Sequence, residues 1–572
     1  MAVSVRPLLV VPTMVDPAFR AQRVEPAAAP MPCPWPGPIQ LTSRFATLKE
    51  KIVAGNEAAL TSSFQRLLRA LPEEIDRVSA LGSEAIPVMA FADATNPQHA
   101  EPFLNSLRER GVGILRGVVP RETALAWARE AQEYASQIFP GTQPPPQDIF
   151  WSSAQVQARA HPNVLAAQKF VMSGAWRSAD PRARVTTDFP ITYADRMGTR
   201  EAAGREASPR AHVDGGSVER WEPDGYGRAG TYRKIWQGRW EEYDPWESST
   251  RLGVTSDLYH KASACSIFRM FQGWLAVNPI PPGPGSVKVC PLPRHATAYF
   301  LLRPFFAPSS PRPSSSSSLF SSSDDDNNHP DSTTPDEWTL NRPQNSILHG
   351  ALPSYAQDIT PSLHPHLDLA RSLIPVPHLE PGDYLVWHPD LIHSVSFSDN
   401  NDTTTATTNS SSSNTNNNNT HDAYTHIYLP ACPLTQTNAL YLARQRKSFL
   451  AGTPGPDFDG ASSRHRLSVS AAPSRRGSSV AGGFSSSSVS SLSISSSSLS
   501  LLPALGGLGG GGESSHPSRA GPTEVGDAGG GDDGLRAMGL VPWDEEDADE
   551  DETREVLAMA NGILFPDLYD ML

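Results

Sequence analysis

The amino-acid sequence predicts an antiparallel β sandwich or barrel preceded by helices. Apolar residues first recur at helical spacing, and after Val213 this period gives way to short apolar runs. Pro-Gly pairs at 282–283, 284–285 and 381–382 separate several of these runs. Short runs bounded by such turns are typical of antiparallel strands, so the fold class is mainly β with flanking helices.

Two helices are expected before the strands. The first has the apolar stripe Leu60, Phe64, Leu67, Leu68 and Leu71, and the second has the stripe Leu125, Ala128, Ala131 and Ala135. Pro72 is expected to end the first helix, because proline has no N–H for the helical hydrogen bond. Pro120 is expected to open the second, after a buried strand predicted at Gly111–Gly117.

The later strands are predicted from the apolar runs themselves. These runs are Ser266–Val277, Ser286–Cys290, Ala298–Leu302, Tyr384–Trp387, His393–Phe397 and His426–Leu429. Low-complexity tracts at 308–336 and 399–420 interrupt them, yet the sequence on both sides stays strand-like. Because surface loops tolerate long insertions, we expect both tracts to be inserts within one domain that spans 36–460.

The ends of the chain are expected to lie outside this domain. Residues 1–35 are predicted to be flexible, and 461–552 to be a disordered tail that is first rich in Ser and Gly and then acidic. Residues 553–572 are predicted to form an amphipathic helix with the apolar stripe Val556, Met559, Ala560, Ile563 and Leu564. Docking of this helix onto the domain is favoured over recruitment of a partner.

Charge and cysteine content exclude several classes of protein. The net charge is −14, but residues 521–572 carry fifteen acids against two arginines, so the rest of the chain is nearly neutral. This balance disfavours nucleic-acid binding and a basic membrane anchor. The four cysteines form no CxxC pair, and no apolar run approaches the length of a membrane helix. A cytoplasmic protein is therefore expected.

The histidine pattern indicates a metal centre. Six His-x-Asp/Glu pairs begin at His99, His212, His329, His366, His378 and His388, and composition alone produces several such pairs. His212-Val-Asp214 differs from the others, because strand-like sequence starts there and Gly215-Gly216 let the backbone approach a ligand. Residues i and i+2 of a strand point to the same side, so both could bind one ion.

The third ligand is expected on a later strand. The turn Pro381-Gly382 leads into the strand at Tyr384–Trp387, and His393 starts the return strand. His388 is the competing candidate. Two histidines and one carboxylate on one face of an octahedral iron(II) ion leave its other face open for substrate and oxygen. The alternative is that these histidines are ordinary hydrogen-bonded residues of the surface and core.

Four segments resemble one known family. They are TYADR at 192–196, AHVDGGSVERW at 211–221, FRMFQGWLAVN at 268–278 and LEPGDYLVWHPDLIHSV at 379–395. Together they resemble a family within the iron(II)/2-oxoglutarate-dependent oxygenases, the clavaminate synthase-like proteins. The resemblance implies a double-stranded β-helix, a cupin-like jelly roll with flanking helices. It also implies iron ligands at His212, Asp214 and His393, with 2-oxoglutarate and O2 as co-substrates.

The resemblance further requires a cation for the distal carboxylate of 2-oxoglutarate. Many members of the superfamily carry an arginine about ten residues after the last histidine, whereas here the next arginine after His393 is Arg444. Arg269 is the preferred candidate, because an arginine in an apolar run needs a partner and can bind a carboxylate through two hydrogen bonds. Arg444 and Arg446 are the alternatives, and so is a structural ion pair for Arg269.

The expected activity is hydroxylation of a small molecule, with release of succinate and CO2. Two other classes of function remain open from the sequence: a non-catalytic cupin-like binding protein, and a metal-dependent isomerase or hydrolase on the same barrel. A small-molecule substrate is expected rather than a nucleic acid or a membrane. The sequence contains no pattern that identifies this substrate or fixes the oligomeric state.

Overall fold

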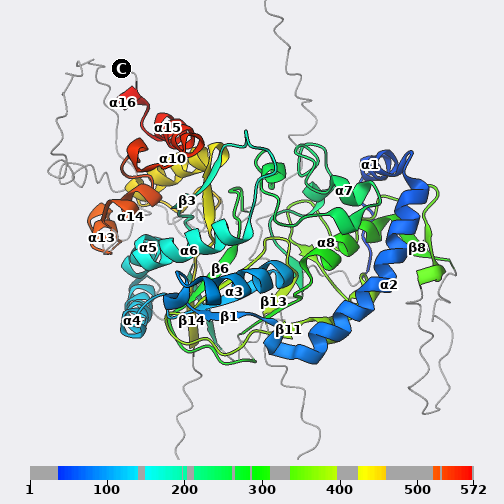
Figure 1. Cartoon of the computed structure of the whole chain (residues 1–572), viewed down its shortest axis with the longest axis horizontal. Coiled ribbons are helices and arrows are strands. Elements are labelled where there is room, and N and C mark those ends of the chain that lie inside the picture. The colour runs from blue at the N-terminus through cyan, green and yellow to red at the C-terminus, as the bar shows by residue number, and fades with distance from the viewer. Residues whose placement is uncertain are drawn as a thin grey trace, which may run out of the picture.

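The computed structural model describes ten segments of the chain (Figure 1). They are residues 37–138, 149–195, 197–201, 211–259, 265–283, 286–309, 335–395, 423–458, 519–528 and 531–569. The N-terminal segment 1–35, the insert at 399–420 and nearly all of the insert at 308–336 lie outside the described residues. Within these segments, no helix combines the length and apolar composition needed to cross a bilayer.

The first two helices are α1 (Arg44–Val53) and α2 (Glu57–Leu81). The expectation that Pro72 ends the helix is wrong, because α2 continues through this residue for another nine positions. The apolar stripe also continues, with Ile75 and Val78 fully buried. Burial of these side chains offsets the hydrogen bond lost at proline, and α2 runs as a long rod along one side of the molecule (Figure 1).

A six-stranded sheet has the strand order β1-β2-β12-β6-β14-β4. Its strands are β1 (Val88–Ala90), β2 (Val112–Arg116), β12 (Tyr384–Trp387), β6 (Gln272–Ala276), β14 (Ala423–Tyr428) and β4 (Met197–Glu201). Only the β1–β2 pair is parallel, and the other described pairs are antiparallel. The strand predicted at Tyr384–Trp387 therefore forms with these same bounds, at the centre of the sheet.

A five-stranded antiparallel sheet has the order β10-β5-β13-β7-β11. Its strands are β10 (Gln357–Asp358), β5 (His212–Val213), β13 (His393–Val395), β7 (Val287–Val289) and β11 (Ile374–Pro375). Two further pairs stand apart, β15 (Cys432–Thr435) with β3 (Val185–Ile191) and β8 (Phe306–Pro308) with β9 (Trp338–Leu340). The described strands trace no closed barrel, so the double-stranded β-helix stays a prediction.

The two faces of the six-stranded sheet contact different layers. On one face, Leu275 and Val386 share a core with α3 (Pro97–Arg110), α4 (Arg121–Ile138), α5 (Ser153–Ala160) and α6 (Pro162–Ala175). On the other face, Trp274 and Trp387 share a core with Val213 and Val289 of the five-stranded sheet. Successive side chains of each strand thus point alternately into the helical layer and into the second layer of strands.

One predicted strand is a helix. The run Ala298–Leu302 lies at the end of α8 (Pro293–Leu302), which packs against α2. Pro293 occupies the first turn of α8, where its missing N–H costs nothing, and every residue from Ala296 to Leu302 is buried. Short apolar runs do not distinguish a buried strand from a buried helix, and this ambiguity explains the wrong prediction.

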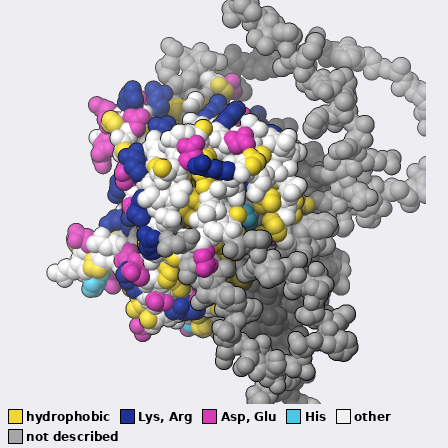
Figure 2. All heavy atoms as spheres, turned by 90° about the vertical axis from the view of Figure 1, so that its right-hand side faces the viewer, with side chains coloured by type: hydrophobic (Ala, Val, Ile, Leu, Met, Phe, Trp, Pro, Cys, Tyr) yellow, Lys and Arg dark blue, Asp and Glu magenta, His cyan; other side chains and the backbone are white. Residues whose placement is uncertain are grey.

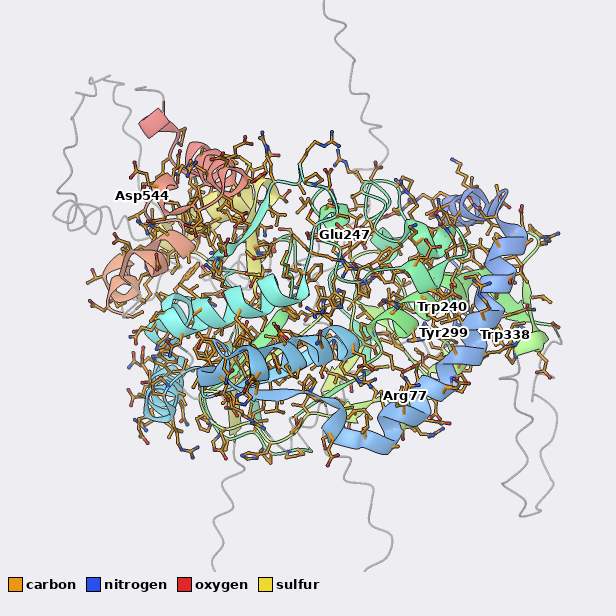
Figure 3. All side chains as sticks on the ribbon, viewed as in Figure 1. Arg77, Trp240, Glu247, Tyr299, Trp338 and Asp544 are labelled. Atoms are coloured by element: carbon orange, nitrogen blue, oxygen red, sulfur yellow. The ribbon has the colours of Figure 1, made fainter. Side chains whose placement is uncertain are left out.

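The C-terminal layer begins earlier than predicted. The structure places α13 (Pro522–Gly526), α14 (Gly531–Ala537), α15 (Asp551–Leu564) and α16 (Pro566–Tyr569) after residue 519, within and beyond the tail expected to be disordered. Apolar residues among the acids account for this order, since Leu535 and Trp543 are almost fully buried. The acidic run starting at Asp544 stays largely exposed at the edge of this layer (Figure 3).

As favoured from the sequence, the terminal helix docks onto the domain. Helix α15 packs against α10 (Gln436–Ala451), β15 and β3. Leu557 and Leu564 share one core with Leu434 and Leu442. Elsewhere on the molecule, the face in Figure 2 has basic and acidic side chains interspersed, as expected of a nearly neutral domain.

Three histidines are buried beside α2 and α8. His349, His364 and His366 are each less than 9% exposed. Tyr299, labelled in Figure 3, forms a 2.9 Å hydrogen bond with His366. Burial, together with the charge of Arg303, lowers the pKa of His364 to about 3 and that of His366 to about 4. The same causes lower the pKa of His349 well below its ordinary value.

We expect mild acid to destabilise this region. Because the folded pKa values lie below the unfolded value of about 6.5, the unfolded chain binds more protons as the pH falls. The neutral histidines make their full contribution to the free energy of unfolding above about pH 6.5. This contribution decreases as the pH falls toward the pKa values of the folded protein, by about 2 kcal/mol per histidine at pH 5. Urea unfolding at pH 7, 6 and 5 measures this loss.

The matched variants for this prediction are His364→Asn and His378→Asn. Asparagine keeps an acceptor where His364 Nδ1 receives the Thr360 N–H, but it takes up no proton. His364→Asn should therefore make the pH dependence shallower, whereas the exposed His378 should leave it unchanged when replaced. If the unfolding free energy of His364→Asn fell as steeply with pH as that of the wild type, the buried His364 would not be a source of the acid sensitivity.

Candidate metal centre

The pairing of β5 with β13 brings two predicted ligands together. His212 opens β5 and His393 opens β13, and the two residues are directly opposite each other in the antiparallel register. Their ring centroids are 4.4 Å apart. Asp214 is two residues after His212, so the alternation of strand side chains places its carboxylate on the same side as the His212 ring.

The three side chains converge on one point. One ligand atom from each of His212, Asp214 and His393 lies within 4.8 Å of the other two. The Asp214 carboxylate oxygens are 3.6 Å from His212 Nε2 and 3.2 Å from His393 Nε2. Two ligand atoms held at right angles, each about 2.1 Å from one ion, lie about 3 Å apart. The donor set therefore fits a single metal ion after small adjustments of the side chains.

The surroundings of His393 favour metal binding through Nε2. Its Nδ1 lies 3.0 Å from the carbonyl oxygen of Leu391 and donates a hydrogen bond to it. A ring held in this way presents Nε2 as its ligand atom, which is the usual arrangement at metal sites. The His393 side chain is 6% exposed, whereas those of His212 and Asp214 are 20% and 34% exposed. The site is thus accessible from the side of His212 and Asp214.

Asp214 has the ionised form that a metal ligand needs. Burial alone would raise its pKa. The charge of His212, the hydrogen bond and charge of His393, and the charge of Arg269 outweigh burial and lower the pKa below its ordinary range. A carboxylate with a lowered pKa is ionised near neutral pH and does not have to release a proton before it binds a cation.

Arg269 lies beside the metal ligands, three residues before β6. Its Nη2 is 3.8 Å from the position that a Cβ atom would take on Gly215. Burial would lower the pKa of Arg269, but Cys265 and Asp214 are among the groups that raise it above its ordinary value. The two alternative arginines belong to α10, where Arg444 lies over the Tyr441 ring and Arg446 donates to the Leu564 carbonyl.

A cavity of about 40 Å³ lies beside Gly215, the residue that follows the predicted ligand Asp214. Its walls include Gly215, Tyr226, Arg251, Ser256, Arg269 and Thr437. Two of the described lining residues are arginines and none is acidic. The charge of Arg251 is paired with Asp390 at 2.7 Å, so Arg269 is the arginine of this lining that favours an anionic ligand, through its N–H donors and positive charge.

The other His-x-acid pairs are not brought to this site. His99 and His378 are exposed and form local ion pairs with Asp93 and Glu380, and His329 lies outside the described residues. His366 is buried beside Tyr299. His388, the competing candidate for the third ligand, stacks on Trp176 in the core, and its Nε2 lies 2.9 Å from the Pro245 carbonyl oxygen.

Sequence reasoning missed a set of buried residues that surround the ligand segments. They are Arg220, Tyr226, Tyr232, Arg251 and Asp390. Asp390 belongs to the pair that begins at His388, in which the histidine alone is a candidate ligand from the sequence. The position of Arg220, between Val218 and Trp221, is a usable signal, because an arginine among apolar residues needs partners when it is buried.

Comparisons with known proteins give one family and several related structures. The sequence profile of the Gig2-like family matches residues 39–475. "Uncharacterized protein YbiU" of Escherichia coli (strain K12) is 27% identical over 402 residues, which cover 67% of this chain and 82% of that protein.

Two crystal structures are similar over most of their length. GlcNAc Inducible Gene 2, GIG2 (DUF1479), from Candida albicans has a TM-score of 0.69 at 22% identity, covering 93% of this chain and 96% of its own. A Salmonella typhimurium LT2 protein solved as "Putative Oxidoreductase" has a TM-score of 0.56 at 26% identity. This similarity covers 73% of the present chain and 90% of the Salmonella protein. The first similarity concerns the fold alone.

Proposed function

This chain belongs to the Gig2-like family, and from its candidate metal centre we propose that it is an iron(II)- and 2-oxoglutarate-dependent oxygenase. The observation that carries the proposal is the convergence of His212, Asp214 and His393 on one point. Two imidazoles and one carboxylate with open positions are the ligand set typical of non-haem iron(II) oxygenases. The oxidoreductase name of the Salmonella protein agrees with this reaction class.

The proposed reaction hydroxylates a C–H bond of a small molecule. Iron(II), when bound, would supply the activation of O2 that is coupled to decarboxylation of 2-oxoglutarate. One oxygen atom enters the substrate and the other enters succinate, and the carboxyl group is released as CO2. The two electrons lost by the substrate and the two lost by 2-oxoglutarate together reduce O2.

The residues of the chain have separate tasks in this reaction. His212, Asp214 and His393 would hold the metal, and Arg269 would neutralise the distal carboxylate of 2-oxoglutarate. The cavity beside Gly215 is partly open and is lined by Arg269, with no acid among its described lining residues.

The test is turnover by the purified full-length protein. Incubation with Fe(II), ascorbate and 2-oxoglutarate, with and without a library of small molecules, should give iron-dependent succinate, and mass spectrometry should find a substrate that gains one oxygen atom. Iron binding without any succinate would favour the non-catalytic binding protein. Absence of both metal binding and 2-oxoglutarate binding would remove the proposal.

Replacing Arg269 with alanine should raise the half-saturating concentration of 2-oxoglutarate by about 10- to 100-fold, because a hydrogen bond to a charged group contributes about 1.5–3 kcal/mol. Initial rates of succinate formation at graded 2-oxoglutarate concentrations measure the change. Arg444→Ala is the matched control, since Arg444 contacts the Tyr441 ring instead. An unchanged concentration in Arg269→Ala, or a rise only in Arg444→Ala, would contradict the assignment.

A further inference from the structure

The backbone that follows the ligand Asp214 is fixed by buried side chains. Three consecutive carbonyl groups, those of residues 214, 215 and 216, each accept a hydrogen bond from a side chain. Arg220 donates to the Asp214 carbonyl at 2.7 Å and to the Gly216 carbonyl at 2.5 Å. Tyr226 donates its hydroxyl to the Gly215 carbonyl at 2.5 Å.

Glycine alone would leave this segment free to move. Gly215 and Gly216 have φ angles of +75° and +105°, a region that glycine adopts readily and other residues rarely do. Such a segment has many accessible backbone conformations in the absence of restraints. The hydrogen bonds from Arg220 and Tyr226 stabilise one of these conformations. That conformation fixes the backbone position of Asp214, from which its carboxylate extends toward the metal site.

The same arginine also contacts the segment that carries the other histidine ligand. Arg220 Nη2, which donates to the Asp214 carbonyl, lies 3.7 Å from Asp390 Oδ1. Asp390 is three residues before His393, and its carboxylate also accepts from Arg251 at 2.7 Å and from Tyr232 at 3.1 Å. One guanidinium therefore joins two ligand-bearing segments that are far apart in the sequence.

A purely structural explanation accounts poorly for so many charges. Arg220, Arg251 and Asp390 are 0%, 4% and 1% exposed, so all three groups lose their contact with water on folding. Apolar residues of similar volume often stabilise a core as well as or better than buried ions do. What a charged network adds is a defined geometry, because its hydrogen bonds fix the directions as well as the distances of its members.

We infer that Arg220 and Tyr226 are positioning residues that hold the 214–216 backbone in the metal-binding arrangement before the ion arrives. This inference rests on the proposed metal centre. Groups that orient metal ligands from outside the coordination sphere typically change metal affinity by about 10- to 100-fold when they are removed. Neither residue needs to touch the ion, since each acts on the ligand through the backbone.

The test compares two tyrosine variants by Co(II) binding to the full-length protein. Tyr226→Phe removes only the hydroxyl at the Gly215 carbonyl. Tyr384→Phe is the matched control, because Tyr384 is also buried and also donates its hydroxyl to a backbone carbonyl, that of Leu429. Calorimetric titration with Co(II) gives the dissociation constants, and thermal unfolding of the metal-free proteins gives the stability of each variant.

Tyr226→Phe should raise the Co(II) dissociation constant by about tenfold or more. Tyr384→Phe should leave this constant unchanged although its unfolding temperature falls by a comparable amount. Unchanged affinity in Tyr226→Phe, or equal weakening in both variants, would overturn the inference. If Tyr226→Phe does not fold, Arg220→Lys replaces it, because lysine keeps the charge near Asp390 but cannot bind both carbonyls as a fork.

The wild-type titration separates the two levels of the proposal. Wild-type protein that binds no Co(II) would count against the metal centre itself, and with it against the positioning role. Wild-type protein that binds Co(II) as tightly as both variants do would count against the positioning role alone. Tighter binding by the wild type than by Tyr226→Phe, with Tyr384→Phe unaffected, supports both.

Discussion

Replacing His212 with alanine should abolish succinate formation and weaken Co(II) or Fe(II) binding by more than about 100-fold, beyond the usual effect of residues outside the coordination sphere. The variant leaves Asp214 and His393 as two ligands, and two ligands do not hold an ion with the geometry that the reaction needs. His212 lies at the start of a two-residue strand, and its side chain is 20% exposed. The unfolding free energy should therefore change by no more than about 1 kcal/mol.

The matched control is His378→Ala. His378 also belongs to a His-x-acid pair, but its ring is 42% exposed and lies 3.0 Å from Glu380. This variant should keep the metal affinity, the succinate yield and the unfolding temperature of the wild type. Metal titration and coupled succinate assays on both variants give the answer, and an active His212→Ala enzyme would exclude the proposed ligand set.

Replacing Leu557 with alanine should destabilise the protein by about 2–5 kcal/mol, the usual cost of a buried leucine. Leu557 is 0% exposed and lies in the core between α15 and the strand pair β15–β3 of the domain. The change removes apolar contacts and leaves a cavity, since neighbouring helices relax only partially. Urea unfolding followed by tryptophan fluorescence measures this loss, with Trp543 in the same core as a reporter.

Glu555→Ala provides the comparison on the same helix. Glu555 is exposed and forms only a 3.7 Å surface ion pair with Arg184. Removal of such a pair should change the unfolding free energy by no more than about 0.5–1 kcal/mol. If Leu557→Ala were as stable as Glu555→Ala, α15 would not pack on the domain in solution.

The convergence of His212, Asp214 and His393 could be predicted in part from a local rule. The i, i+2 rule places His212 and Asp214 on one side of a strand whatever the rest of the fold does. The resemblance to the oxygenases then selected His393 over His388. The structure brings the three side chains together and places His388 in the core, between Trp176 and the Pro245 carbonyl.

The buried network was not predictable in the same way. Arg220 and Asp390 are 170 positions apart in the sequence, so no local pattern relates them. An ion pair of this kind depends on which loops meet after folding, and propensity or periodicity contains no such information. The arginine in VERW indicated only that some partner was needed, and the pairing itself comes from the tertiary structure.

Secondary structure was mispredicted where burial outweighs local preference. Pro72 is a strong local signal for the end of a helix, yet the buried stripe of α2 continues beyond it. Ala298–Leu302 has the composition of a strand, but it packs as a helix against α2. In both cases the contacts made by α2 and α8 decide the conformation, and they involve residues far away in the sequence.

The C-terminal layer packs on the domain of the same chain, although many residues separate the two in the sequence. The described structure leaves the domain at Phe458 and returns to it at Arg519, where the next residue, Ala520, donates to the Trp151 carbonyl. Residues 519–528 and 531–569 thus pack on the domain of the same chain as a separate C-terminal layer. Two parts of one chain meet at an effective concentration that does not depend on the concentration of the protein. Association of the C-terminal layer with the domain is therefore intramolecular, and dilution of the protein should not separate them.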